Sequence, residues 1–268
     1  MTAPLSRRPN TGKWTAFPHA DKAYTYTAAT LKTHWERLHK GDCEPFPKDA
    51  KVQEAWIAYH AGEFEKAAEL GLRAGAAGYN AANKATNIYA NYLENSAAKK
   101  LKLYQEVATR CEELQQREPK NANAFYLHAY ALGRYSQGIS VLKALSQGLG
   151  SNVKASLEQA LKLHAKHADA HIAFGTYHAE IIDKVGSLIG GVTYGAKKEA
   201  GMEHFRRALK LNPDSAIARV EYANGMIMML GGVKMKEAEK LYQEAAKCKP
   251  ADAMERLDVE LAKSELED

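Results

Sequence analysis

Four histidines stand close together in the segment LHAKHADAHIAFGTYH, and imidazole is a common metal ligand: His164, His167, His171 and His178. On one helix, His167 and His171 would lie four residues apart on the same face, where two imidazoles can chelate an ion. A helix start predicted at Ala168–Asp169 separates them, however, and His178 lies two turns beyond His171. The pattern therefore favours histidines at helix ends and in packing, and it leaves open whether the segment binds a metal.

Thioether sulfur is a second soft-metal ligand, and the segment GMIMMLGGVKMK carries four methionines, Met226, Met228, Met229 and Met235. Methionine at helical spacing more often fills a core, so a core role is favoured. An adaptable apolar groove is the second interpretation, and a copper site is the third.

The three cysteines, Cys43, Cys111 and Cys248, are widely spaced and form no CxxC pair. Cys111 and Cys248 fall on helix faces beside apolar residues, which is typical of small core thiols in a reducing compartment. A catalytic cysteine with a partner histidine is the alternative, and no local motif supports it.

The sequence shows no constellation that would predict catalysis. The carboxylates of Asp169, Glu180, Asp183 and Glu221 are expected on helices without a shared motif, and there is no Ser/His/Asp set or HExxH helix. Two glycine-rich stretches, QGLGSN and GGVTYGAKK, could cradle an anion with free backbone N–H groups. Neither has the GxxxxGKS spacing or follows a predicted strand, so structural turns are favoured. We expect no enzyme activity, no catalytic residue, no metal site and no cofactor.

Charge and hydropathy exclude further classes of function. The net charge is +5 and 26% of the residues are charged, with lysines scattered among Asp and Glu on helix faces. Because there is no dense basic stripe with interleaved aromatics, nucleic-acid binding is not expected.

No run reaches the roughly 18 to 20 apolar residues of a membrane helix, and the first residues lack the apolar region of a secretory signal. We predict a cytoplasmic protein, provided that no leader was trimmed.

A gapless motif that recurs four times organises the elements that would position these groups. Its copies begin at Pro119, Ala165, Pro213 and Pro250, each after an amphipathic segment, and they lie 46, 48 and 37 residues apart. In the third copy, NPDS, the proline ends one helix, and the aspartate or serine can cap the next. Periods of this size are typical of a solenoid of helix pairs.

The repeated residues resemble the tetratricopeptide repeat (TPR), whose unit is about 34 residues. The segment 170–178 matches its first helix, with Gly175 where helices approach, and Phe205 to Ala208 with the LNPDS turn match its second helix and exit. The resemblance covers about residues 50–255. It implies an all-α fold, a TPR-like α-solenoid in which helix-turn-helix pairs build a right-handed superhelix.

Two of the repeats are longer than the standard unit, and their extra residues form glycine-rich, apolar insertions at 136–152 and 183–197. We interpret both insertions as extensions of the first helix of a pair, each closed by a glycine turn. The stretch from Gly186 onward also resembles the TPR-like domain of the regulator-of-microtubule-dynamics family, which has a glycine-bearing segment before a KxHFxxALxLxPxD run. It departs from that family in having Asn224-Gly225-Met226 where a tryptophan is frequent.

The predicted domain organisation has two parts. Residues 1–20 form an extended N-terminal arm, and residues 21–268 form one TPR-like domain with capping helices at both ends. Stacked as in the family, the first helices of the pairs would line a concave groove. The residues expected on that groove are Tyr126, Tyr130, Arg134, Ile172, Thr176, Glu180, Val220, Asn224, Ile227 and Met228.

The repeat architecture, without a catalytic constellation, implies a non-enzymatic scaffold or adaptor that binds a peptide or protein segment in its concave groove. The alternative is a small apolar ligand-binding protein, with a pocket closed by the insertions at 136–152 and 183–197. A deep enclosed cavity beside the insertions would favour the ligand-binding protein, and an open trough would favour the adaptor. The partner, the pathway and the oligomeric state are left open.

Overall fold

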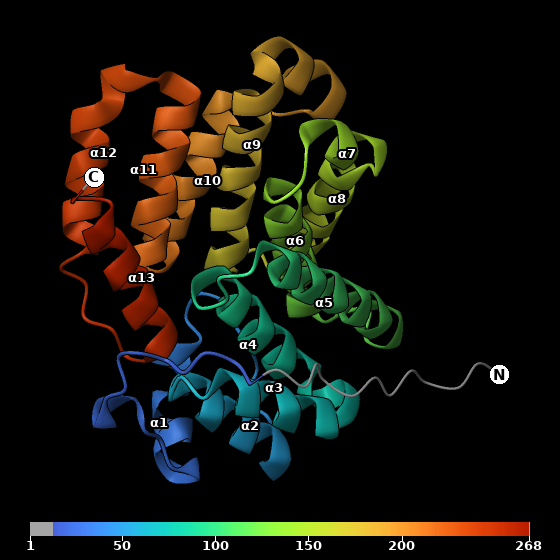
Figure 1. The fold of residues 1–268 in the computed structure, drawn as a ribbon, viewed down its shortest axis with the longest axis vertical. Coiled ribbons are helices and arrows are strands. Elements are labelled where there is room, and N and C mark those ends of the chain that lie inside the picture. The colour runs from blue at the N-terminus through green and yellow to red at the C-terminus, as the bar shows by residue number, and fades with distance from the viewer. Residues whose placement is uncertain (1–12, 268) are drawn as a thin grey trace.

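The computed structural model describes residues 13–267, and within them every regular element is helical (Figure 1). Short 3₁₀ or π turns occupy Lys22–Tyr24, Gly75–Gly78, Gly190–Tyr194 and Gly232–Lys234. The α-helices are α1 (Ala28–Leu38), α2 (Ala50–His60), α3 (Phe64–Arg73), α4 (Tyr79–Tyr92), α5 (Ala97–Arg117), α6 (Ala122–Gln137), α7 (Val141–Ser146), α8 (Leu149–Leu163), α9 (Ala168–Ile189), α10 (Lys198–Leu211), α11 (Ala216–Leu230), α12 (Met235–Ala245) and α13 (Ala253–Ser264).

The helices stack in pairs along the chain. The pairs are α2 with α3, α4 with α5, α6 with α8, α9 with α10, and α11 with α12. The first helices of neighbouring pairs also touch, as α4 touches α6 and α9 touches α11. Because each pair contacts its neighbours along the stack, the architecture is a helical-repeat solenoid, and the predicted all-α fold is confirmed.

The four recurrent motifs each begin a helix. Helices α6, α9, α11 and α13 start three residues after the first residue of each motif. The residue before each start differs in type, but its side chain always accepts a hydrogen bond from the backbone N–H three residues on. These capping residues are Asn121, His167, Ser215 and Asp252. The shared spacing therefore reflects a shared need to satisfy the free N–H groups of a first turn.

Close packing between pairs depends on one aromatic ring and two glycines. Phe205 of α10 is fully buried between α9 and α11. A Cβ on Gly175 of α9 would lie 2.7 Å from this ring, and one on Gly225 of α11 would lie 2.5 Å from it. Gly175 thus stands where two helices approach closely, as its place in the motif predicts.

The insertions differ from the predicted form in part. The first does not extend α6, which ends at Gln137, because Ser140 caps the separate short helix α7 and Gly148, at φ 63°, turns the chain into α8. The second does extend its helix, since α9 continues to Ile189. Gly186 interrupts α9 with φ 80° and ψ 160°, a conformation that only glycine adopts readily.

The predicted N-terminal arm falls partly outside the described residues, which begin at Lys13. From Lys13 to Ala20 the chain forms no helix. Trp14 stacks on Tyr89 of α4, with the ring centroids 4.0 Å apart. Phe17 packs edge-on against Phe64 of α3. These two aromatic contacts attach the described part of the arm to the first pairs.

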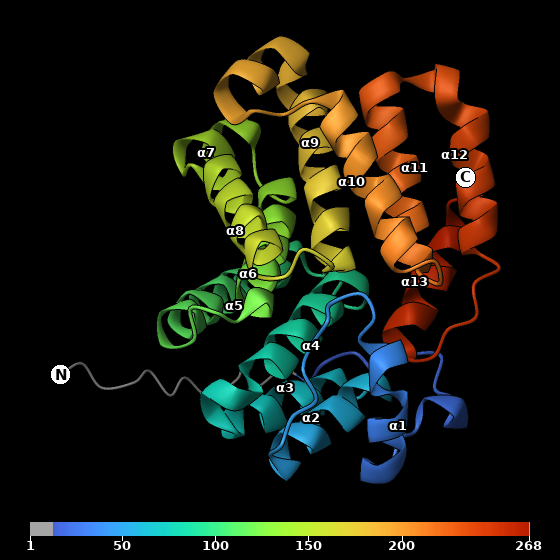
Figure 2. The same ribbon diagram turned by 180° about the vertical axis from the view of Figure 1, so that it is seen from behind.

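The C-terminal helix joins the two ends of the solenoid. In both views α13 lies between α11 and α12 on one side and the N-terminal helices on the other (Figures 1 and 2). Arg37 of α1 donates two hydrogen bonds to the carboxylate of Glu255, at 2.5 and 2.9 Å. His60 of α2 donates one to Asp252, at 2.7 Å. Helix α13 therefore caps the last pair and also closes the stack onto its first helices.

Candidate ligand cavity

The inner surface of the closed stack holds a cavity of about 180 Å³, which we call the central cavity. Its wall is built by α4, α6, α9 and α11, with α13 on one side and α7 and α8 at the first insertion. Its aliphatic residues include Ile88, Leu149, Val153, Ile172, Ile181 and Met254, and its tyrosines are Tyr92, Tyr126, Tyr130, Tyr177 and Tyr194. The wall is mainly apolar and aromatic, as in most small-molecule sites.

Both insertions contribute to this wall. The first supplies Leu145 and Leu149, and the second supplies Lys184, Val185 and Tyr194. The hydroxyl of Tyr177 on α9 donates a hydrogen bond to the carbonyl oxygen of Tyr194, at 3.1 Å, which holds the second insertion against its own helix. The insertions therefore form one end of the central cavity.

Six of the residues predicted for the groove line the central cavity: Tyr126, Tyr130, Arg134, Ile172, Thr176 and Glu180. The other four predicted residues, all on α11, lie outside it: Val220, Asn224, Ile227 and Met228. Val220 and Ile227 pack in the cluster that includes α12 and α13, and Asn224 accepts a hydrogen bond from Tyr242 of α12. Since α12 and α13 cover that face, α11 instead presents Ile217 and Glu221 to the cavity.

Three cations on the cavity wall each have a carboxylate partner. Lys84 pairs with Asp42 at 2.5 Å and is 5% exposed. Arg134 pairs with Glu221 at 2.7 Å, and its guanidinium also stacks over Tyr130. The third pair joins Lys184 to Glu180 at 2.6 Å. These charges are therefore neutralised in place.

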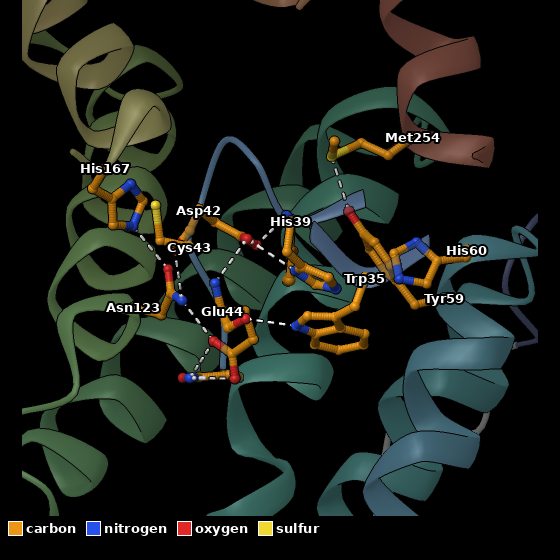
Figure 3. Close-up of polar contacts among 12 residues, drawn as sticks. Trp35, His39, Asp42, Cys43, Glu44, Tyr59, His60, Asn123, His167 and Met254 are labelled. Atoms are coloured by element: carbon orange, nitrogen blue, oxygen red, sulfur yellow. Dashed lines mark hydrogen bonds and ion pairs between the residues drawn. The ribbon is translucent and has the colours of Figure 1, made fainter. Parts of the chain in front are cut away.

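A buried polar network adjoins the cavity wall at the loop after α1, and Figure 3 shows its contacts. The carboxylate of Asp42 accepts hydrogen bonds from His39 at 2.9 Å and from Lys84 at 2.5 Å. Burial opposes ionisation of Asp42, but these two partners outweigh it and hold the pKa of that carboxyl below its usual range. Asp42 is therefore an anion that anchors the loop to α4.

Glu44 continues the network toward α6 and α9. It accepts hydrogen bonds from Asn80 at 2.9 Å and from Asn123 at 2.5 Å. Burial and the charge of Asp42 raise the pKa of Glu44 to about 8, so this carboxyl is mostly protonated at neutral pH. Asn123 in turn accepts from Nε2 of His167, at 2.8 Å. The loop thus binds three helices together by polar contacts that sequence patterning does not reveal.

Two histidine–aspartate pairs in this region have the form of a catalytic dyad, but neither histidine lines the cavity. His39 donates to Asp42 and His60 donates to Asp252, while both rings are buried. Neither histidine is among the residues that line the central cavity. Burial lowers the pKa of His39 to about 4, so its ring is neutral at physiological pH. The pairs fix loop and helix positions.

The clustered histidines have separate structural roles. His167 caps α9, and His178 accepts a hydrogen bond from the backbone N–H of Lys197, at 3.2 Å. His171 contacts His204 of α10 through their Nδ1 atoms, at 2.8 Å. Among residues 13–267, no group of three or more His, Cys, Asp and Glu side chains is placed to hold a metal ion. The geometry matches helix-end and packing roles.

The methionines and cysteines of the candidate sites divide between core and surface. Met226 and Met229 are buried core residues, whereas Met235 is 52% exposed. Cys111 is buried in the main core and accepts a hydrogen bond from Asn83, at 3.3 Å. The other two cysteines, Cys43 and Cys248, are partly buried and unpaired by disulfides.

Comparison with solved structures supports the fold of this chain. It is similar to TTC0263, a thermophilic TPR protein of Thermus thermophilus, with a TM-score of 0.56 and 18% identity over 80% of this chain and 97% of that one. It also aligns to YrrB, a TPR protein with an unusual peptide-binding site, with a TM-score of 0.39 and 15% identity over 88% and 100% of the two chains. A scan of protein-family models and a search of curated proteins found no match.

The likeness to TTC0263 shows the fold: this chain has a TPR-like helical-repeat fold. The narrower resemblance to the regulator-of-microtubule-dynamics family has no counterpart among these matches and stays a prediction. Over residues 13–267, none of the helices is long and apolar enough to cross a membrane.

Proposed function

We propose that this protein is a non-enzymatic helical-repeat scaffold that binds a small, largely apolar ligand in the central cavity. The carrying observation is the partly open cavity of about 180 Å³, lined by tyrosines and aliphatic side chains from helices along most of the stack. Engineered apolar cavities of roughly 150 Å³ already take up benzene. A compact molecule built around one aromatic ring therefore fits the volume.

The closing position of α13 favours this function over the predicted peptide-binding adaptor. Met254, Glu255 and Asp258 of α13 form one side of the cavity wall, where an open groove would be needed to admit an extended chain. The contacts of Arg37 and His60 hold α13 in that position. Peptide binding in the concave groove, and with it a protein partner, stays a prediction that requires α13 to move away.

Gly133 offers a direct test of the cavity. It lies on α6, on the same stripe as Tyr126 and Tyr130, and a Cβ at this position would meet no atom within 4 Å. Gly133→Leu should therefore fill part of the cavity without a clash, and Gly133→Ala is the matched control. Both replacements also remove a helix-interior glycine, which favours folding.

The assay is titration calorimetry with 2-phenylethanol, together with native mass spectrometry of the gently purified protein. We expect the unmodified protein and Gly133→Ala to bind the alcohol, and Gly133→Leu to lose at least tenfold in affinity. Equal binding by both variants would place the ligand outside the cavity. Mass spectrometry that detects a co-purifying polypeptide and no small ligand would favour the adaptor instead.

A further inference from the structure

The central cavity has more carboxylates than cations. The lining carboxylates are Asp42, Asp169, Glu180, Glu221, Glu255 and Asp258. Four of them pair with a cation: three with the lining cations described above, and Glu255 with Arg37. Among the described residues, no ion pair reaches Asp169 or Asp258 within 4.0 Å. The cavity therefore contains two acidic groups that have no paired cation.

Asp169 lies in the first turn of α9, beside the α1–α2 loop. Its backbone N–H donates a hydrogen bond to the carbonyl oxygen of Gly41, at 3.0 Å. Its carboxylate packs against Gly41, because a Cβ added to that glycine would lie only 2.2 Å from Oδ1 of Asp169. No side chain in the described part of the chain donates a hydrogen bond to this carboxylate. The nearby ammonium of Lys84 is instead bonded to Asp42. A donor arriving in the cavity would find the acceptor oxygens of Asp169 free.

Asp258 lies across the cavity on α13 and is 3% exposed. It accepts one hydrogen bond, from the hydroxyl of Tyr92 at 2.5 Å. Tyr126 also lines the cavity, and burial raises the pKa of its hydroxyl, with the charges of Asp169 and Asp258 adding to the rise. Both unpaired acids and the rings of Tyr92 and Tyr126 therefore line the same cavity.

We propose that the ligand of the central cavity carries a protonated amine, whose ammonium group pairs with Asp169 and Asp258 while its apolar body contacts the tyrosine and aliphatic wall. This inference rests on the proposed small-ligand function. An ammonium supplies the missing positive charge and the N–H donors that these carboxylates lack. The faces of Tyr92 and Tyr126 also attract a cation through their ring quadrupoles. A carboxylate ligand would add a further negative charge to a wall that is already acidic.

The same chemistry predicts a pH dependence of amine binding. Burial raises the pKa of Asp169 to about 7, with Lys84 opposing the rise and Asp42 and Glu255 adding to it. Cys43, Tyr126 and Asp258 also interact electrostatically with Asp169. Burial raises the pKa of Asp258 well above its usual range, so this carboxyl ionises only when a cation such as the ammonium lies beside it. Because the raised pKa leaves Asp169 partly protonated near neutrality, affinity for an amine should rise between pH 6 and pH 8 as the carboxylate forms.

The test compares three probes of nearly equal size: 2-phenylethylamine, 2-phenylethanol and 3-phenylpropanoate. Titration calorimetry at pH 8 should give the amine an affinity about tenfold or more above that of the alcohol, as expected for a charged hydrogen bond. The carboxylate probe should bind weakest. Between pH 6 and pH 8 the affinity of the amine should rise, and that of the alcohol should stay constant.

Three conservative variants locate the charge effect. Asp169→Asn and Asp258→Asn keep the side-chain shape and should reduce amine affinity toward that of the alcohol, while alcohol binding is unchanged. Asp183→Asn is the control, because Asp183 is exposed on the same helix and does not line the cavity. If the amine and the alcohol bind with equal affinity, and neither Asp169→Asn nor Asp258→Asn changes this, the amine inference is overturned and the small-ligand function still stands. If no probe binds, the proposed function itself is overturned.

Discussion

Replacing Asp252 by alanine removes two contacts from one buried side chain. Asp252 is 1% exposed, caps α13 by accepting from the backbone N–H of Glu255 at 2.8 Å, and accepts from His60 at 2.7 Å. Loss of an N-cap costs about 1 kcal/mol. A buried donor left without its acceptor costs about 1 to 3 kcal/mol, and His60 has no exposed surface. Asp252→Ala should therefore lower the free energy of unfolding by about 2 to 4 kcal/mol.

Asp49 provides the matched control for this substitution. It also caps a helix, α2, by accepting from the backbone N–H of Lys51 at 2.9 Å, but it is exposed and has no second partner among the described residues. Asp49→Ala should cost only the cap, about 1 kcal/mol. Urea denaturation followed by circular dichroism measures both variants. If both variants lose the same free energy of unfolding, the contact between His60 and α13 contributes nothing to stability, and it does not hold the stack closed.

Three further predictions test the packing and the charges. Gly175→Ala should destabilise the protein by about 1 to 3 kcal/mol, because the new methyl group would meet the ring of Phe205; thermal unfolding that matches the unmodified protein would contradict this. Lys84→Met should cost about 3 to 5 kcal/mol in urea denaturation, since it leaves a buried carboxylate without its cation, and a neutral effect would show that the carboxyl protonates at little cost. Burial lowers the pKa of His39 to about 4 and that of His167 to about 3, below the ordinary value near 6.5. The stability that these neutral rings contribute is therefore complete above pH 6.5 and falls as the pH drops toward 4. His167→Asn keeps a capping acceptor and should show a smaller loss between pH 7 and pH 5.

The sequence was most informative where structure depends on local chemistry. The four motifs located the starts of α6, α9, α11 and α13 because capping and helix termination are decided within a few residues. The sequence does not show which side of α11 faces the cavity. That side depends on α12 and α13, which come later in the chain and pack against α11.

The polar network was also beyond sequence patterning. Lys84 lies 42 residues from Asp42, and Asn123 lies 79 residues from Glu44, so no periodic signal joins them. The segment from Gly41 to Asp49, GDCEPFPKD, reads as a linker because its polar residues and prolines are typical of one. Only the tertiary fold shows that its acidic residues are held between helices.

Closure of the stack and binding in the cavity should be energetically linked, because α13 takes part in both. Its Met254 and Asp258 line the cavity, while Asp252 holds its first turn in place. If Asp252→Ala populates an open position of α13, apparent affinity falls in proportion to the closed fraction that remains. The rise in unfolding temperature with excess 2-phenylethylamine should therefore be smaller for Asp252→Ala than for Asp49→Ala. An equal rise in the two variants would mean that the probe does not use the α13 side of the cavity, and that the closing helix serves stability alone.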